Sequence, residues 1–197
     1  MVATQIPQQV YDDLRMSAIH EAGHVVLRAD GGWIVEKVEI KPHTQLLRFP
    51  GKTTANGSAN IPNIQADPDT HLAPPLGGYA ATLVAFRAGT LTNFKNEVGL
   101  MAWSSEGTDG DEAMYDLVLK ALGKPLLPTD QWARAKAFHD AADQIAVPRL
   151  LKRRDDVEAV ADAIYETVAP EFQVGVPFGG REILADELFS KSFFYMK

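Results

Sequence analysis

The sequence contains no cysteine, which excludes a disulfide framework, a thiol nucleophile and a cysteine-based zinc site. It is also short of positive charge, because 19 basic residues stand against 26 acidic ones and the net charge is −7. We therefore expect no nucleic-acid partner and interpret the basic cluster Lys152–Arg154 as a solvated helix end. No apolar run reaches the ~20 residues of a membrane-spanning helix, and no secretory signal is visible. These absences predict a cytoplasmic protein without a membrane span.

The length and composition fit one globular domain. The 197 residues only slightly exceed the roughly 150 of an average domain, and 46% hydrophobic with 23% charged residues is ordinary. We expect an N-terminal tail at 1–13, a folded domain at 14–188 and a C-terminal tail at 189–197.

Apolar spacing predicts a helix at 12–29 that Gly31 and Gly32 end, followed by a strand with a bulge at 33–40. Segment 42–75 holds half of the 12 prolines, which predicts a long, turn-rich connection with a hairpin near Asn56 and Gly57. Further helices are predicted at 76–88, 111–122, about 130–145 and 156–168.

The most informative pattern is HExxH, from His20 to His24 inside the first predicted helix. Residues at i and i+4 share one helix face, so the imidazoles of His20 and His24 can bind one zinc ion. Glu21 then lies beside the ion, where it can take a proton from a zinc-bound water. The alternative is an amphipathic helix that carries two histidines by chance. Apolar flanking residues favour a buried helix, in which these three polar side chains need partners.

Such a zinc site needs a third protein ligand, and the residues alone leave three alternatives open. Asp30 occupies the position at which the metzincin zinc-binding pattern has its third ligand. That pattern also requires a glycine at position 27, where this sequence has Leu27. Glu36 or Glu39 would come from the strand, where both are predicted to face solvent. Asp111 begins a predicted helix, whose dipole favours an ionised carboxylate. By itself, however, Asp111 is better interpreted as an ordinary helix-terminal acid.

Several stretches carry a family resemblance when they are taken together. They are Ala18–His24, the strand Trp33–Pro42, the Leu76–Ala81 segment with its Gly-Gly pair, Gly107–Asp111, and Leu150–Val168. In this order they resemble the peptidase domain of the FtsH-type ATP-dependent zinc metalloproteases. The resemblance covers most of 14–188 and implies a mainly α-helical fold with a small β element beside a zincin-like HExxH helix.

Carried over by position, the resemblance implies that His20, His24 and Asp111 bind Zn²⁺ and that Glu21 is the catalytic base of a zinc metalloendopeptidase. The chain departs from the family at several points. Tyr79 replaces an arginine of the Gly-Gly helix, Gly110 replaces an asparagine, and 43–75 does not align. The family's ATPase module and membrane anchor have no counterpart in the 197 residues.

The function expected from these features is ATP-independent hydrolysis of flexible polypeptides, or of polypeptides that a separate unfoldase chain supplies. Assembly into a homo-oligomer is left open. The alternative is a non-catalytic, zinc-containing interaction or regulatory module. The departures from the family favour that alternative and the intact Glu21 opposes it. A closed site is a related outcome, with His43, His71 or Asp30 as a fourth ligand.

Three smaller expectations concern the surroundings of the motif. Gly23 is expected to let another helix approach closely, because it has no side chain. The edge of the 33–40 strand is a candidate for pairing with an extended peptide, although a covered strand fits equally well. His139 is expected on the surface of a later amphipathic helix.

Overall fold

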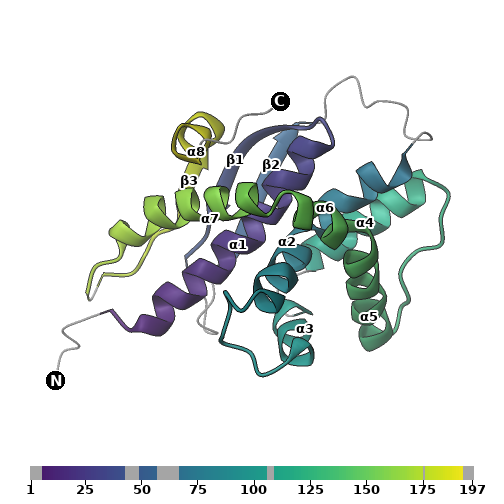
Figure 1. The fold of residues 1–197 in the computed structure, drawn as a ribbon, viewed down its shortest axis with the longest axis horizontal. Coiled ribbons are helices and arrows are strands. Elements are labelled where there is room, and N and C mark those ends of the chain that lie inside the picture. Colours follow the sequence, from purple (N-terminus) through teal and green to yellow (C-terminus); the bar gives the residue numbers. More distant parts are fainter. Residues whose placement is uncertain (1–5, 43–48, 57–66, 106–108, 175, 193–197) are drawn as a thin grey trace.

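The computed structural model describes residues 6–42, 49–56, 67–105, 109–174 and 176–192. Its helices are α1 (Gln8–Asp30), α2 (Pro68–Arg87), α3 (Glu97–Ser105), α4 (Asp109–Ala121), α5 (Gln131–Ala141), α6 (Val147–Lys152), α7 (Arg154–Val168) and α8 (Ala185–Ser192). Its strands are β1 (Ile34–Ile40), β2 (Gly51–Asn56) and β3 (Arg181–Leu184). The fold is mainly α-helical with a small antiparallel sheet, as expected (Figure 1). Within the described residues, no helix is both long and apolar enough to cross a membrane.

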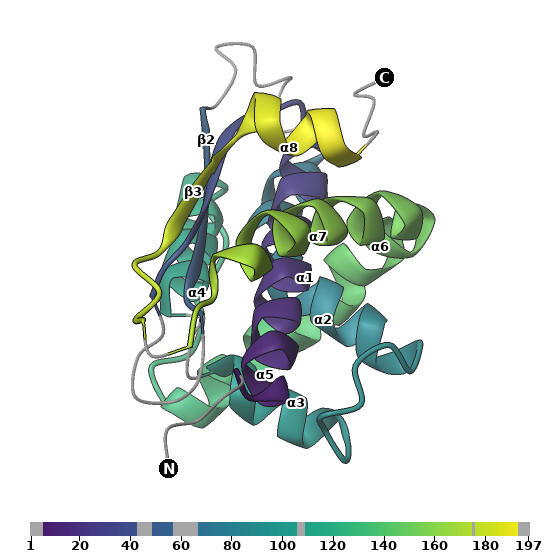
Figure 2. The same cartoon turned by 90° about the vertical axis from the view of Figure 1, so that its left-hand side faces the viewer.

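The described strands form one sheet in the order β2-β1-β3, with β1 antiparallel to both neighbours. The predicted bulge is confirmed, because the register between β1 and β2 shifts between Val35 and Lys37. Val35, Val38 and Ile40 are buried in the core. Figure 2 shows the sheet along one side of the molecule, with α1 and α7 packed on the same face.

Helix α1 lies at the centre of the molecule, packed against α2, α7 and the sheet (Figures 1 and 2). Its contact with α2 depends on glycine. A Cβ added to Gly23 would lie 2.6 Å from the Cβ of Ala81, and one added to Gly77 would lie 2.7 Å from the carbonyl oxygen of Gly23. The close helix approach expected at Gly23 is therefore confirmed.

The predicted connection at 42–75 is wrong in two places. Gly51–Asn56 forms β2, and α2 begins at Pro68 instead of at residue 76. Pro74 and Pro75 lie inside this helix and lack the N–H groups that would bond the carbonyls four residues earlier. Burial of the surrounding apolar side chains outweighs that loss. The hairpin predicted near Gly57 lies outside the described residues.

The helix predicted at about 130–145 is a regular α-helix only as far as Ala141. Asp130 caps α5 by accepting a hydrogen bond from the backbone N–H of Ala133 at 2.8 Å. A π-helical turn, Ala142–Ala146, then leads into α6, which contains Pro148. The predicted break at Pro148 is thus a wide turn just before the proline, so the chain stays helical through this region.

His139 is buried, and the surface position expected for it is wrong. Its side chain is only 5% exposed and stacks on Tyr79, with ring centroids 4.0 Å apart and planes 27° apart. Neither ring nitrogen has a hydrogen-bond partner among the described residues. Burial lowers the pKa of His139 from 6.5 to about 4, so the ring is neutral at neutral pH.

We expect His139 to make the fold sensitive to acid. Because the pKa of His139 is lower in the folded state, the unfolded chain binds the proton first as the pH falls. The resulting loss of stability begins near pH 6.5 and reaches about 2 kcal/mol by pH 4.5. Urea unfolding at pH 7.5 and 4.5 measures it, and His139→Phe is expected to lose about 2 kcal/mol less than wild type over this interval. Equal losses in both proteins would contradict the prediction.

Candidate metal centre

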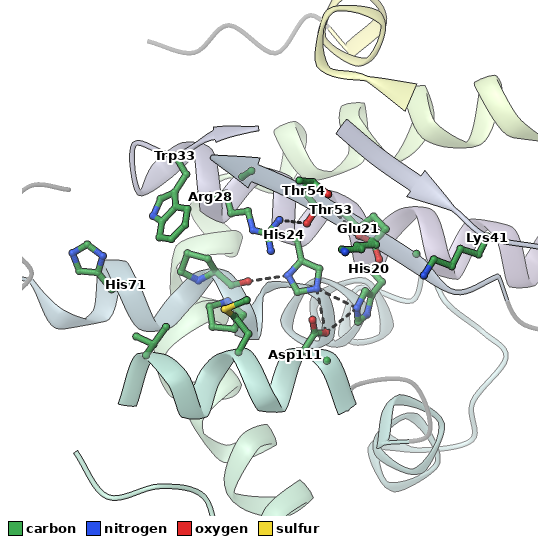
Figure 3. Close-up of a pocket in the computed structure, with 18 residues that line it drawn as sticks. His20, Glu21, His24, Arg28, Trp33, Lys41, Thr53, Thr54, His71 and Asp111 are labelled. Atoms are coloured by element: carbon green, nitrogen blue, oxygen red, sulfur yellow. Dashed lines mark hydrogen bonds and ion pairs between the residues drawn. The ribbon is translucent and has the colours of Figure 1, made fainter. Parts of the chain in front are cut away.

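Three donor atoms from two helices converge on one point of the structure. His20 and His24 project from α1 and Asp111 from the first turn of α4 (Figure 3). The two Nε2 atoms lie 3.2 Å apart, and each lies 3.2 Å from Oδ2 of Asp111. We call this group the donor triangle. It brings together three of the residues singled out from the sequence, two of them separated from the third by about ninety positions.

The donor triangle has the size that a metal ion requires. Ligand atoms about 2.0–2.1 Å from a tetrahedral zinc ion lie roughly 3.3 Å from one another. The observed separations of 3.2 Å match this spacing. Two imidazoles and one carboxylate also form a donor set suited to zinc and related divalent ions. The three residues could therefore hold a metal ion.

The charge of Asp111 is maintained by its neighbours. Burial raises the pKa of this carboxyl group, but the imidazoles of His24 and His20 outweigh burial and hold its pKa well below the usual range. Burial likewise lowers the pKa of His24, and the Asp111 carboxylate more than offsets it, so the pKa of His24 is raised. The first turn of α4 adds a favourable helix-dipole field. Asp111 is therefore an anionic donor.

Residues of helix α2 contact both histidine rings and orient them. Nδ1 of His24 donates a hydrogen bond to the carbonyl oxygen of Pro74 at 2.8 Å in the neutral tautomer that leaves Nε2 unprotonated. Gly78 packs against the other ring, because a Cβ there would lie 2.6 Å from Cδ2 of His20. Sequence reasoning did not identify Pro74, since it lies in the segment that was predicted as a loop.

Glu21 lies beside the donor triangle and is not part of it. Its side chain is 2% exposed, and Oε2 accepts a hydrogen bond from Oγ1 of Thr53 on β2 at 2.6 Å. Gly51 borders the same carboxylate, because a Cβ there would lie 2.5 Å from Cδ of Glu21. Neither Thr53 nor Gly51 was identified from sequence, because β2 was not predicted.

The other candidate ligands lie elsewhere. Asp30 pairs with Nη1 of Arg149 at 3.3 Å and with Nη1 of Arg153 at 3.2 Å, so the metzincin alternative is wrong for this structure. Glu36 is exposed on β1, and neither it nor Glu39 joins the donor triangle.

Two histidines were candidates for a fourth ligand. His71 is buried and is not part of the donor triangle, although it lines the same cavity as the triangle. His43 lies outside the described residues.

The donor triangle lines a cavity of about 410 Å³. Residues Gly51–Ala55 of β2 form one wall, and Met114 and Val118 of α4 contribute to another. The volume is in the range of sites that hold small ligands or short peptide segments. The donors and Glu21 therefore lie in the wall of a cavity large enough for such a ligand.

Of the two alternatives for the 33–40 strand, the covered strand is confirmed and the peptide-pairing edge is wrong, because β1 is paired on both sides. Strands β2 and β3 are the edge strands of the described sheet, and β2 borders the cavity. In the described part of the chain, no further strand pairs with its outer edge.

Comparisons with known proteins do not identify a family, since no family model and no curated protein matches the sequence. The residues that bear on the function of the site are therefore those of the site itself. Those residues are the donor triangle, the adjacent buried carboxylate of Glu21 and the cavity that both line.

Proposed function

We propose that this protein is a zinc metallopeptidase that hydrolyses peptide bonds of flexible polypeptides. The observation that carries the proposal is the donor triangle with 3.2 Å separations, next to Glu21 and in the wall of one cavity. The resemblance to FtsH-type peptidase domains names the same four residues. A purely structural metal site would have no need of a glutamate in this position.

In this proposal His20, His24 and Asp111 hold the ion. A bound zinc ion would act as a Lewis acid on the scissile carbonyl and lower the pKa of a water molecule toward ~7. Pro74 supports the site by fixing the tautomer of His24 through its 2.8 Å hydrogen bond. Asp111 supplies the negative charge that partly neutralises the dication.

Glu21 serves as the general base in this scheme. Thr53 holds Oε2 by its 2.6 Å hydrogen bond, so the carboxylate keeps one orientation, and Oε1 would accept the proton of the attacking water. The same proton then passes from Glu21 to the nitrogen of the leaving amine. The missing side chain at Gly51 provides space beside the carboxylate.

Strand β2 is the proposed support for the substrate. Its outer edge can pair with an extended peptide, and pairing of this kind needs only backbone groups. The edge borders the cavity that contains the donors, so a paired segment would pass close to them. This arrangement favours polypeptides that are already unfolded, because a folded chain offers few free backbone groups.

Cleavage of casein by the zinc-loaded protein tests the proposal. Wild type is expected to cleave it, and Glu21→Gln is expected to retain zinc but lose at least about 100-fold in rate, because the amide cannot accept the proton. Gel electrophoresis and metal analysis measure the two properties. Equal cleavage by both proteins would rule out Glu21 as the base. Bound zinc without cleavage by wild type would support the non-catalytic module instead.

A further inference from the structure

We propose that the cavity selects polypeptides that carry a carboxylate, and that Arg28 binds this carboxylate. This inference rests on the proposed function and adds a substrate preference to it. Arg28 follows His24 by four residues, so the two share one face of α1. Both side chains line the same cavity, as Figure 3 shows.

Arg28 is unusual among the arginines of this protein. Every other arginine whose side chain the structure describes forms an ion pair with a carboxylate: Arg15, Arg87, Arg134, Arg149, Arg153, Arg154 and Arg181. Arg28 instead donates a hydrogen bond from Nη1 to the backbone carbonyl of Thr53. A guanidinium has five N–H donors, so the others remain available to a ligand. Burial lowers the pKa of Arg28, and the carboxylates of Glu21 and Asp111 act on it only through space, without an ion pair. An anionic ligand in direct contact would offset the remaining cost of burying the guanidinium.

An aromatic ring lies in the wall of the same cavity next to Arg28. Trp33 lines it near Arg28 (Figure 3), and its buried indole Nε1–H has no hydrogen-bond partner among the described residues. The Trp33 nitrogen has no accessible surface, so Trp33 contributes an aromatic wall and Arg28 is the donor at this end of the cavity.

The charge of the cavity also differs from that of the whole protein. The chain carries a net charge of −7, yet three cations line the cavity: Arg28, Lys41 and Lys52. None of them forms an ion pair with a carboxylate in the described part of the chain. The two carboxylates among the described lining residues, Glu21 and Asp111, would be balanced by a bound dication. The loaded cavity would therefore attract an anionic segment.

Arg28 and Lys41 lie on opposite sides of the donor triangle in Figure 3. Lys41 and Lys52 are exposed, so solvent and salt screen their contribution. Arg28 is less exposed and fixed on Thr53 of the edge strand, so it can recognise a carboxylate specifically. The carboxylate can belong to an aspartate or glutamate side chain or to the C-terminus of the substrate.

Peptide binding to zinc-loaded Glu21→Gln protein tests this inference without requiring catalysis. The probes are fluorescein-labelled peptides of equal length. One set has an amidated C-terminus and a single glutamate, placed at each position in turn. The neutral peptide has glutamine in place of that glutamate and an amidated C-terminus, and a third peptide has the same glutamine sequence with a free C-terminal carboxylate. Fluorescence anisotropy is expected to give at least about 10-fold tighter binding for one carboxylate-bearing peptide than for the neutral one. The peptide that gains affinity identifies the source of the carboxylate.

Adding Arg28→Gln is expected to abolish this preference. Adding Arg154→Gln is the matched control, because that exposed arginine pairs with Glu158 away from the cavity, and it is expected to change nothing. If Arg28→Gln lowers the thermal midpoint, Arg28→Lys keeps the charge and is expected to retain part of the preference. Equal binding of all peptides, or a preference that survives both Arg28 substitutions, would overturn the inference.

The two proposals can fail separately. Casein cleavage by wild type together with equal binding of all peptides would remove the carboxylate preference and leave the peptidase proposal intact. A carboxylate preference that depends on Arg28, in a protein that holds zinc and cleaves nothing, would support the binding site and contradict the peptidase.

Discussion

Purified Asp111→Ala protein is expected to contain less than about a tenth of the zinc in wild type, because zinc affinity falls by more than ~100-fold when a ligand is removed. Wild type is expected to hold about one zinc per chain. The physical reason is that two imidazoles remain, without the anionic donor that now lies 3.2 Å from each of them. Elemental analysis after dialysis against a weak chelator measures the content.

Two further variants make this experiment specific. His20→Ala removes another member of the donor triangle and is expected to behave like Asp111→Ala. Asp30→Ala is the matched control, since it deletes an aspartate that pairs with Arg149 and Arg153. It is expected to keep its zinc. Loss of zinc from Asp30→Ala with full retention by Asp111→Ala would show that the third ligand has been assigned wrongly. Circular dichroism establishes that each variant is folded.

The local part of the site was predictable from sequence and the distant part was not. His20 and His24 lie one helical turn apart, so their convergence follows from helix geometry alone. Asp111 is 87 residues from His24, and on sequence alone it was better explained as a helix-terminal acid. Only the family resemblance singled it out. Its approach to the histidines depends on how α4 packs against α2, which no local pattern encodes.

The same distinction explains the errors in the fold. Helix α7 and the bulged β1 follow from periodic burial, which a sequence displays directly. Strand β2 and the first turns of α2 were not predicted, because proline and glycine normally interrupt regular structure. Tertiary packing overrides that tendency here. His139 was misplaced because the helix pattern cannot reveal that Tyr79 covers its ring.

Gly23→Ala is expected to destabilise the fold by about 3 kcal/mol or more, since overpacking against a rigid backbone exceeds the usual cost of an added methyl group. A Cβ at this position would lie 2.7 Å from the carbonyl carbon of Gly77 and 2.6 Å from Cβ of Ala81. Neither atom belongs to a flexible side chain, so α1 and α2 must separate. Helix propensity alone would give the opposite sign, because alanine is favoured over glycine by roughly 0.5–1 kcal/mol.

Gly99→Ala in α3 separates these two effects, because a Cβ there would meet nothing closer than 3.7 Å. Urea unfolding of metal-free protein is expected to show that Gly99→Ala is unchanged or up to about 1 kcal/mol more stable. Unchanged stability of Gly23→Ala would contradict the close approach of α1 and α2. Since α2 also contributes Pro74 and Gly78 to the histidines, the separation is expected to lower zinc affinity in any Gly23→Ala protein that still folds. The glycine between the two histidines therefore links the stability of the fold to the geometry of the metal centre.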